Sequence, residues 1–448
     1  MAARPDRGIV ITLAFAVLAG GLSFLATQGL IFMIGAAGLA GGLLILVLLG
    51  SERTATFLLM LAFGTAPMYR GIEGLTGGVA TPTDFLLILG IVLLLPSLTH
   101  NRLRLPGLYV LGLSLVFVMG LLAALVNGTP IGDAFELAQW IFFLGGLPAI
   151  IAWWHPSVRT VDALLWSYLA GHLLSTAVAL VEGPDATDRY QGLTHHPNAF
   201  ALAGQMSIAI VLYLIPRNKK LWVRLLLFGI AGSAILSLIL SGSRASTLVA
   251  AVLIIMIPVV ERSAVSGFLL YATGALVLVA LPFLAASGGK GSALTRLTGG
   301  GTAAAADASR SEGIQYGFSR FWDSPIFGSG LNQIELIHNI FLEVLDSVGV
   351  FGAVGYLCVL YTLARPLFSH HPLRRLSYMA WALIGVAAAL PGLWDRTIWI
   401  PLSLAILTVL PVKDGTEPEP TPAPAVRRRP AGSDLRAPAG LPLRRPSA

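Results

Sequence analysis

The chain has 448 residues, of which 56% are hydrophobic and only 11% are charged. Soluble domains carry roughly 25% charged residues, so this composition excludes an ordinary soluble globular protein and indicates a membrane protein. The single cysteine excludes a disulfide framework and a thiolate metal site. The net charge of +7 indicates membrane topology rather than nucleic-acid binding, because the basic residues lie in short loops between apolar segments.

Apolar segments long enough to cross a bilayer as helices recur along the first 411 residues. We therefore expect an all-α fold, a polytopic transmembrane helical bundle of about 12–14 spans. The first span should stay uncleaved, because a second apolar segment follows it without a small-residue cleavage site. The fourteen candidate spans are 9–27, 30–50, 55–68, 84–98, 106–126, 135–152, 161–182, 199–215, 222–241, 245–260, 264–286, 340–364, 376–391 and 396–411. Those at 55–68, 84–98 and 376–391 are short for a bilayer, so one or two segments could be re-entrant or interfacial.

The distribution of basic residues sets the orientation of these spans. With both termini in the cytoplasm, 21 of the 29 Lys and Arg residues fall on the cytoplasmic side, as the positive-inside rule expects. Because the rule disfavours basic residues on the other side, those that remain there are candidates for function. They are Arg70, Arg189, Arg244, Lys290, Arg296, Arg310, Arg320 and Arg396.

Three regions follow from this topology. Residues 1–411 form the membrane-embedded domain, and 287–338 form one large extracytoplasmic loop within it. Residues 412–448 are rich in Pro, Ala and Arg without apolar periodicity, so we expect a disordered cytoplasmic tail.

The extracytoplasmic loop contains a segment with apolar residues at helical spacing. This pattern predicts a short helix over 310–322, with Arg310 on its apolar face and Pro325 ending it. The preceding stretch, 287–308, is rich in Gly and Ala, and we expect it to be flexible.

Two shorter outward segments carry polar residues beside apolar spans. In DRYQGLTHHPNAFALAG (188–204), Pro197 begins a helix and Asn198 is a candidate N-cap. In SGSRAS (241–246), Arg244 stands at the mouth of two spans, where an arginine is costly unless it meets a counter-charge, a carbonyl group or water. Ser243 adds a hydroxyl donor beside it. A plain loop-to-helix junction in the first segment, and a snorkelling arginine in the second, remain the alternatives.

The span at 340–364 is preceded by His338 and Asn339. Asn339, Glu343 and Asp346 are spaced as one polar stripe on that helix, which we expect to face the bundle interior rather than lipid. Guanidinium groups bind phosphate through two nitrogens and stay charged, and a histidine can take a proton from an attacking hydroxyl. Together these residue types suit transfer of a glycan from a lipid-linked diphosphate to a hydroxyl acceptor.

The segments SGSRAS, DASRSEGIQYGFSRFWDSPIFGSG and HNIFLEVLDSVGVFGAVGY resemble the O-antigen ligase and polymerase superfamily. The resemblance covers roughly 189–355. It implies an inverting transferase of undecaprenyl-diphosphate-linked glycans, in the bacterial cytoplasmic membrane, with its active site outside and no metal or nucleotide cofactor. It also implies that Arg244 and Arg310 bind the donor diphosphate and that His338 is the acceptor base.

The same resemblance implies a further donor contact at Arg189. The remaining candidates for substrate binding are Asn198, Ser243, Arg320 and Asn339. The expected partners are the lipid-linked glycan donor, a glycan or lipid acceptor and the bilayer, and no nucleic acid. Whether the acceptor is that of a ligase or of a polymerase stays open.

Other classes of membrane protein remain as alternatives. A flippase or other polysaccharide transporter would place its charges near the membrane midplane and show internal repeats, whereas these charges gather on one side. A metal-dependent glycosyltransferase would need paired carboxylates early in the chain, and the sequence has no Asp-x-Asp. A non-enzymatic scaffold leaves the outward arginines unexplained.

Overall fold

A computed structural model provides the structure of the chain. It divides the chain into two units, Met1–Val412 and Lys413–Ala448. The residues that it describes are 50–68, 81–99, 101–127, 129–287, 289–300, 303–331, 337–390, 393 and 395–411. The first expected span, nearly all of the second, Arg70 and the expected tail lie outside the described residues.

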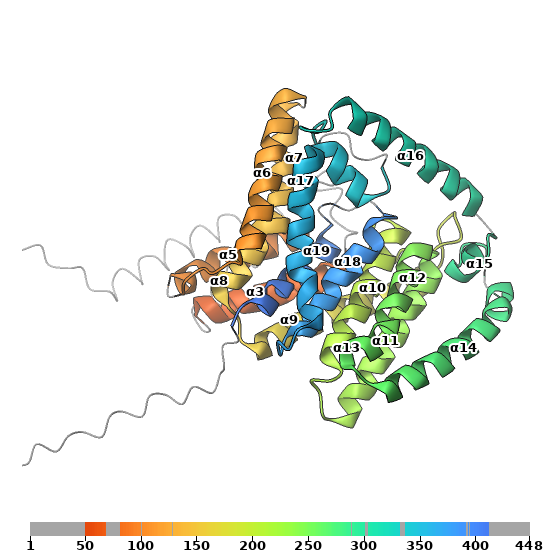
Figure 1. Cartoon of the computed structure of the whole chain (residues 1–448). Coiled ribbons are helices and arrows are strands. Elements are labelled where there is room, and N and C mark those ends of the chain that lie inside the picture. Colours follow the sequence, from red (N-terminus) through yellow and green to blue (C-terminus); the bar gives the residue numbers. More distant parts are fainter. Residues whose placement is uncertain are drawn as a thin grey trace, which may run out of the picture. The chain divides into compact units, whose positions relative to one another are not determined.

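Within those ranges every regular element is a helix, which confirms the all-α fold class (Figure 1). The first half comprises α3 (Ser51–Thr65), α5 (Pro82–Leu98), α6 (Gly107–Val126), α7 (Pro130–Ile141), the π-helix η1 (Phe142–Gly146), α8 (Leu147–Trp154), α9 (Val158–Glu182), α10 (Pro197–Leu214) and α11 (Leu221–Ser241). The second half comprises α12 (Arg244–Ile255), α13 (Ile257–Glu261), α14 (Ala264–Ser287), α15 (Ala293–Leu297), α16 (Ala303–Asp323), α17 (Ile340–Ala364), the 3₁₀ helices η2 (Arg365–Phe368) and η3 (Arg374–Ser377), α18 (Tyr378–Ala387), α19 (Arg396–Leu402) and the 3₁₀ helix η4 (Ser403–Val409).

Seven helical stretches among the described residues are long and apolar enough to cross a membrane. They are Gly107–Val126, Pro130–Trp154, Val158–Glu182, Pro197–Leu214, Leu221–Ser241, Arg244–Glu261 and Ile340–Phe368. Each coincides with one of the spans expected from the sequence, so the helical bundle and the membrane class are supported. The short apolar segments do not all reach the length of a span. The helix α18 has only 10 residues, which is about 15 Å of helix against the roughly 30 Å of a bilayer core.

Helix α10 lies at the centre of the packing. Of its 18 residues 89% are buried, and it packs against α9, α11, α12, α18 and α19 (Figure 1). Its sequence is rich in small residues, which let neighbouring helices approach closely without lipid between them. The start of α10 is therefore held by helices on several sides.

Helix α17 packs along α6 and is kinked near its start. Gly349 supplies the kink with φ +66°, and a Cβ there would lie 2.1 Å from the carbonyl oxygen of Ile326. Only glycine meets both demands, because other residues rarely adopt positive φ and would collide with this backbone. The kink thus allows the connection between α16 and α17 to dock on α17.

The expected extracytoplasmic loop contains two helices, α15 and α16. The predicted helix over 310–322 is confirmed, although it begins earlier, at Ala303, and ends at Asp323, just before Pro325. The stretch 287–308 was expected to be flexible, yet it contains α15 and the first turn of α16. Figure 1 shows α16 running from the neighbourhood of α15 to α17, against which it packs.

Candidate functional site

Three helices, α10, α12 and α17, begin at one cluster of charged residues. The N-cap positions are His196, Ser243 and Asn339. Side-chain contacts link these helix starts, because Arg189 bonds to Asn198 of α10 and Arg244 of α12 shares Asp307 with Arg310. The charge of Arg310 also lowers the pKa of His338, just before α17. The first turn of a helix carries unpaired N–H groups and a partial positive charge, so the site favours an anion before any side chain is counted.

Arg189 joins the loop 183–196 to the end of α11 and the start of α10. Its Nε donates to the carbonyl oxygen of Ser241 at 2.6 Å, and its Nη2 donates to Oδ1 of Asn198 at 2.7 Å. Burial and the neighbouring Arg296 lower the pKa of Arg189 to about 10, so it stays charged at neutral pH. The prediction that Asn198 caps α10 is wrong. His196 is the N-cap, its Nδ1 accepting from the backbone N–H of Asn198, and the Asn198 side chain instead holds Arg189.

Arg244 is the first residue of α12 and forms an ion pair with Asp307 of α16. Its Nη1 donates to Oδ2 at 3.1 Å, and its Nη2 donates to Oδ1. This is the counter-charge that the sequence near Arg244 lacks, and it lies 63 residues away. Arg310 also reaches Asp307, with Nη1 3.6 Å from Oδ1. The hydrogen bonds from Arg244 lower the pKa of Asp307, so this carboxylate is ionised.

Arg296 on α15 is a fourth arginine of the same cluster. It is only 3% exposed, and its Nη1 donates to the carbonyl oxygen of Gly242 at 2.5 Å. In the part of the chain that the structure describes, no group accepts a hydrogen bond from its Nε. Burial lowers the pKa of Arg296 most, and the positive charges of Arg244 and Arg310 lower it further. Arg296 is one of the eight cations that the sequence leads us to expect outside the cytoplasm. This position is the signal that could have identified it, but it was not among the predicted site residues.

His338 lies just before α17, facing Arg310. Burial and the charge of Arg310 lower its pKa below the ordinary 6.5, so the imidazole is neutral at pH 7 and can accept a proton. The next residue, Asn339, has a structural role, since its Oδ1 accepts from the backbone N–H of Leu342 at 3.1 Å and caps α17. The hydroxyl of Ser243 is buried and donates to that of Ser246, with 3.3 Å between the two oxygens.

Arg320 belongs to a different cluster from the one predicted. Its Nη2 donates to Oγ of Ser329 at 2.6 Å, and its Nε lies 3.4 Å from Oδ2 of Asp346. Ser329 Oγ in turn donates to Asp346 Oδ1 at 2.7 Å. These contacts fasten the connection after α16 to α17, so Arg320 anchors the loop. Glu343 and Asp346 are buried, which confirms that this polar stripe faces the bundle interior.

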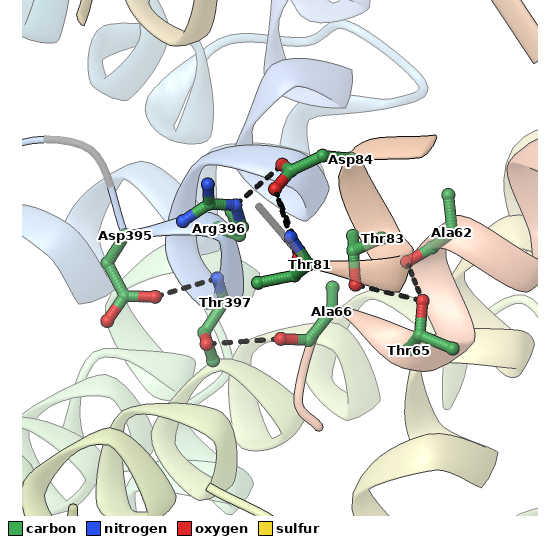
Figure 2. Close-up of polar contacts among 9 residues, drawn as sticks. All are labelled: Ala62, Thr65, Ala66, Thr81, Thr83, Asp84, Asp395, Arg396 and Thr397. Atoms are coloured by element: carbon green, nitrogen blue, oxygen red, sulfur yellow. Dashed lines mark hydrogen bonds and ion pairs between the residues drawn. The ribbon is translucent and has the colours of Figure 1, made fainter. Parts of the chain in front are cut away.

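The position of Arg396 is likewise explained by its side-chain contacts (Figure 2). Its Nε donates to Oδ1 of Asp84 at 2.6 Å. The other carboxylate oxygen of Asp84 accepts from the backbone and hydroxyl of Thr81 and forms a capping box at the start of α5. Asp395 caps α19 by accepting from the backbone N–H of Thr397 at 2.8 Å. This outward cation therefore ties α19 to α5 and lies apart from the arginine cluster.

The arginine cluster thus consists of Arg189, Arg244, Arg296 and Arg310, with His338 beside it. Within the described ranges, no three His, Cys, Asp or Glu side chains lie together in a way that could hold a metal ion. The chain matches no protein-family model, and no curated protein matches it. What can be said of its function therefore rests on this geometry.

Proposed function

We propose that this protein is a bacterial membrane glycosyltransferase. It transfers a glycan from an undecaprenyl diphosphate to a hydroxyl group of an acceptor, on the extracytoplasmic side of the cytoplasmic membrane. The observation that carries the proposal is the arginine cluster at these helix starts. Arg189 bonds to Asn198, Arg296 bonds to the carbonyl oxygen of Gly242, and Arg244 and Arg310 share Asp307. The charge of Arg310 also acts on His338 at the start of α17. Four cations and three helix N-termini form a site for a multiply charged anion.

The charges of the site match the charges that develop in such a transfer. The acceptor oxygen forms a bond to the anomeric carbon, while the bond from that carbon to the diphosphate oxygen breaks. The leaving diphosphate gains negative charge, which the arginines stabilise in place. His338 takes the proton of the attacking hydroxyl, and its neutral state at pH 7 suits this role of general base.

Attack from the face opposite the diphosphate inverts the anomeric configuration. The proposal therefore requires His338 to reach the acceptor hydroxyl on one side of the sugar while the arginines hold the diphosphate on the other. In the proposal, Arg244 and Arg310 hold the diphosphate with Arg296, and Arg189 keeps the start of α10 in place while adding charge. The bilayer supplies the donor, whose polyprenyl chain stays in the membrane while its diphosphate lies at the surface.

The proposal can be tested by deleting the gene and complementing with single variants. Arg244→Gln, Arg310→Gln and His338→Gln should each abolish the surface glycan made by the wild type. Lys290→Gln is the matched control, because it removes an exposed cation from the same loop and should leave the glycan unchanged. Full activity of the three site variants would contradict the assignment.

The same strains distinguish the acceptors. Short but attached chains would indicate a polymerase, and long chains left on the lipid carrier would indicate a ligase. Donor that accumulates in the cytoplasmic leaflet would indicate a flippase and refute a transferase.

A further inference from the structure

Asp307 is the carboxylate that faces the arginine cluster. It receives Nη1 and Nη2 of Arg244 on its two oxygens, and Arg310 approaches one of them to 3.6 Å. Its electrostatic interactions extend to Arg296 as well. A carboxylate that bridges two guanidinium groups in this way occupies the position that phosphate oxygens take in a bidentate arginine complex.

One carboxylate does not neutralise this cluster. Arg296 is buried near the Asp307 pair and interacts with this carboxylate only through its charge. A diphosphate carries more charge and more acceptor oxygens than a carboxylate. It can therefore bond to Arg244 and Arg310 as Asp307 does and also balance more of the charge of Arg296.

The Asp307 contact is also easily exchanged. Its side chain is 53% exposed while that of Arg244 is 21% exposed, and ion pairs in such a setting contribute little to stability. The residues around it on α16, Ala304, Ala308 and Ser309, are exposed too. The helix packs on the bundle further along, where Gly317 meets Ile337 and Leu342. Water can therefore receive the carboxylate without disturbing the packed half of α16.

We propose that Asp307 is an internal counter-ion, which fills the arginine cluster while the site is empty and gives way when a diphosphate ligand binds. The inference rests on the proposed function, because it assumes that the cluster binds a diphosphate. It adds a selection step, since a ligand must displace a carboxylate already in place. Two linked phosphates displace it better than a single phosphate, because they bring more negative charge and more acceptor oxygens to the same arginines.

The test uses the full chain in lipid nanodiscs, with inorganic pyrophosphate and inorganic phosphate as probes in isothermal titration calorimetry. Asp307→Asn should tighten pyrophosphate binding about five- to tenfold, which corresponds to the energy of one ion pair in water. It should also reduce the ratio of the affinity for pyrophosphate to the affinity for phosphate. Glu312→Gln is the matched control. It removes one negative charge from an exposed position of the same helix, so its affinity should stay within about twofold of the wild type.

The outcomes separate the two proposals. If wild type binds pyrophosphate, Arg244→Gln abolishes binding, and Asp307→Asn binds no tighter than Glu312→Gln, the counter-ion role is refuted while the diphosphate site stands. Weaker binding by Asp307→Asn would also refute it, because Asp307 would then position the arginines. If neither wild type nor Asp307→Asn binds pyrophosphate, the diphosphate site fails and the inference fails with it. Binding by Asp307→Asn alone would support the inference most strongly.

Discussion

The ion pair between Asp84 and Arg396 gives the sharpest test of how the ends of α5 and α19 are held. Asp84 accepts from Nε of Arg396 at 2.6 Å, and from the backbone and hydroxyl of Thr81 at 2.8 and 2.9 Å. The Arg396 side chain is 6% exposed and that of Asp84 is 17% exposed. Asp84→Ala removes both the capping box and the carboxylate that faces a buried guanidinium.

The two ends of this pair should not be equivalent. Removing one partner of a buried ion pair costs about 3–5 kcal/mol, and loss of an N-terminal cap adds about 1 kcal/mol. Since Asp84 is partly hydrated, we take the lower end and expect Asp84→Ala to lower the free energy of unfolding by about 3–4 kcal/mol. Arg396→Met should cost less, about 1–2 kcal/mol, because Asp84 keeps its bonds to Thr81 and methionine fills the space of the arginine stem.

Equilibrium unfolding of the full chain in mixed detergent micelles measures both values and that of the double variant. The double variant should be more stable than the sum of the single effects predicts, by at least about 1.5 kcal/mol, because both charges leave together. Arg217→Met is the control. Its pair with Asp162 is 3.0 Å long but more exposed, and Asp162 keeps the hydrogen bond from Tyr213, so about 1 kcal/mol or less is expected. Equal costs for Asp84→Ala and Arg396→Met, or strict additivity, would refute the reasoning.

Three further predictions concern the site and its support. Arg244→Lys keeps the charge but loses the two-nitrogen fork, so kcat/KM in a transfer assay should fall about ten- to a hundredfold, and an unchanged value would contradict its role. The acid limb of kcat/KM should lie below pH 6.5, because burial and Arg310 lower the pKa of His338 and activity is lost as pH falls through it. In an NMR titration of the His338 imidazole, Arg310→Gln should raise the pKa of His338 and Arg310→Lys should leave it in place; a lower pKa in Arg310→Gln would refute the assignment. Gly349→Ala should destabilise by about 3 kcal/mol or more in the same unfolding assay, since its Cβ would lie 2.1 Å from a backbone oxygen, while Gly229→Ala meets nothing within 4 Å and serves as control.

The long spans could be predicted because apolar length is a local property of the sequence. A helix such as Gly107–Val126 needs no knowledge of its neighbours to be recognised. Short apolar segments cannot be settled in that way. Tyr378–Ala387 is largely buried by other helices, and whether ten apolar residues meet protein or lipid depends on contacts made far away in the chain. The break of the span at 245–260 into α12 and α13 has a local cause instead, because Pro258 lacks the backbone N–H that would bond to the preceding turn.

Residue type and the side of the membrane expected from the positive-inside rule selected Arg189, Arg244, Arg310 and His338. They were not enough to separate Arg296 from Arg320, since both are arginines in the same expected extracytoplasmic loop. The two side chains differ in the partners that they meet from distant parts of the sequence. Asp346 and Ser329 receive Arg320, whereas the short helix α15 turns Arg296 onto the backbone of Gly242. No local pattern encodes either pairing.

The site combines a fixed part with a part that is free to change. Arg189 and Arg296 donate to the backbone carbonyl oxygens of Ser241 and Gly242, where α11 ends beside the buried start of α10. These two arginines therefore keep their positions whether or not a ligand is present. Asp307, by contrast, lies on the exposed half of α16. A ligand that displaces it meets a preformed set of donors and disturbs only a solvated ion pair. This division keeps the ordering entropy of binding small, and it would suit the proposed transferase, which must bind and release a charged diphosphate in every cycle.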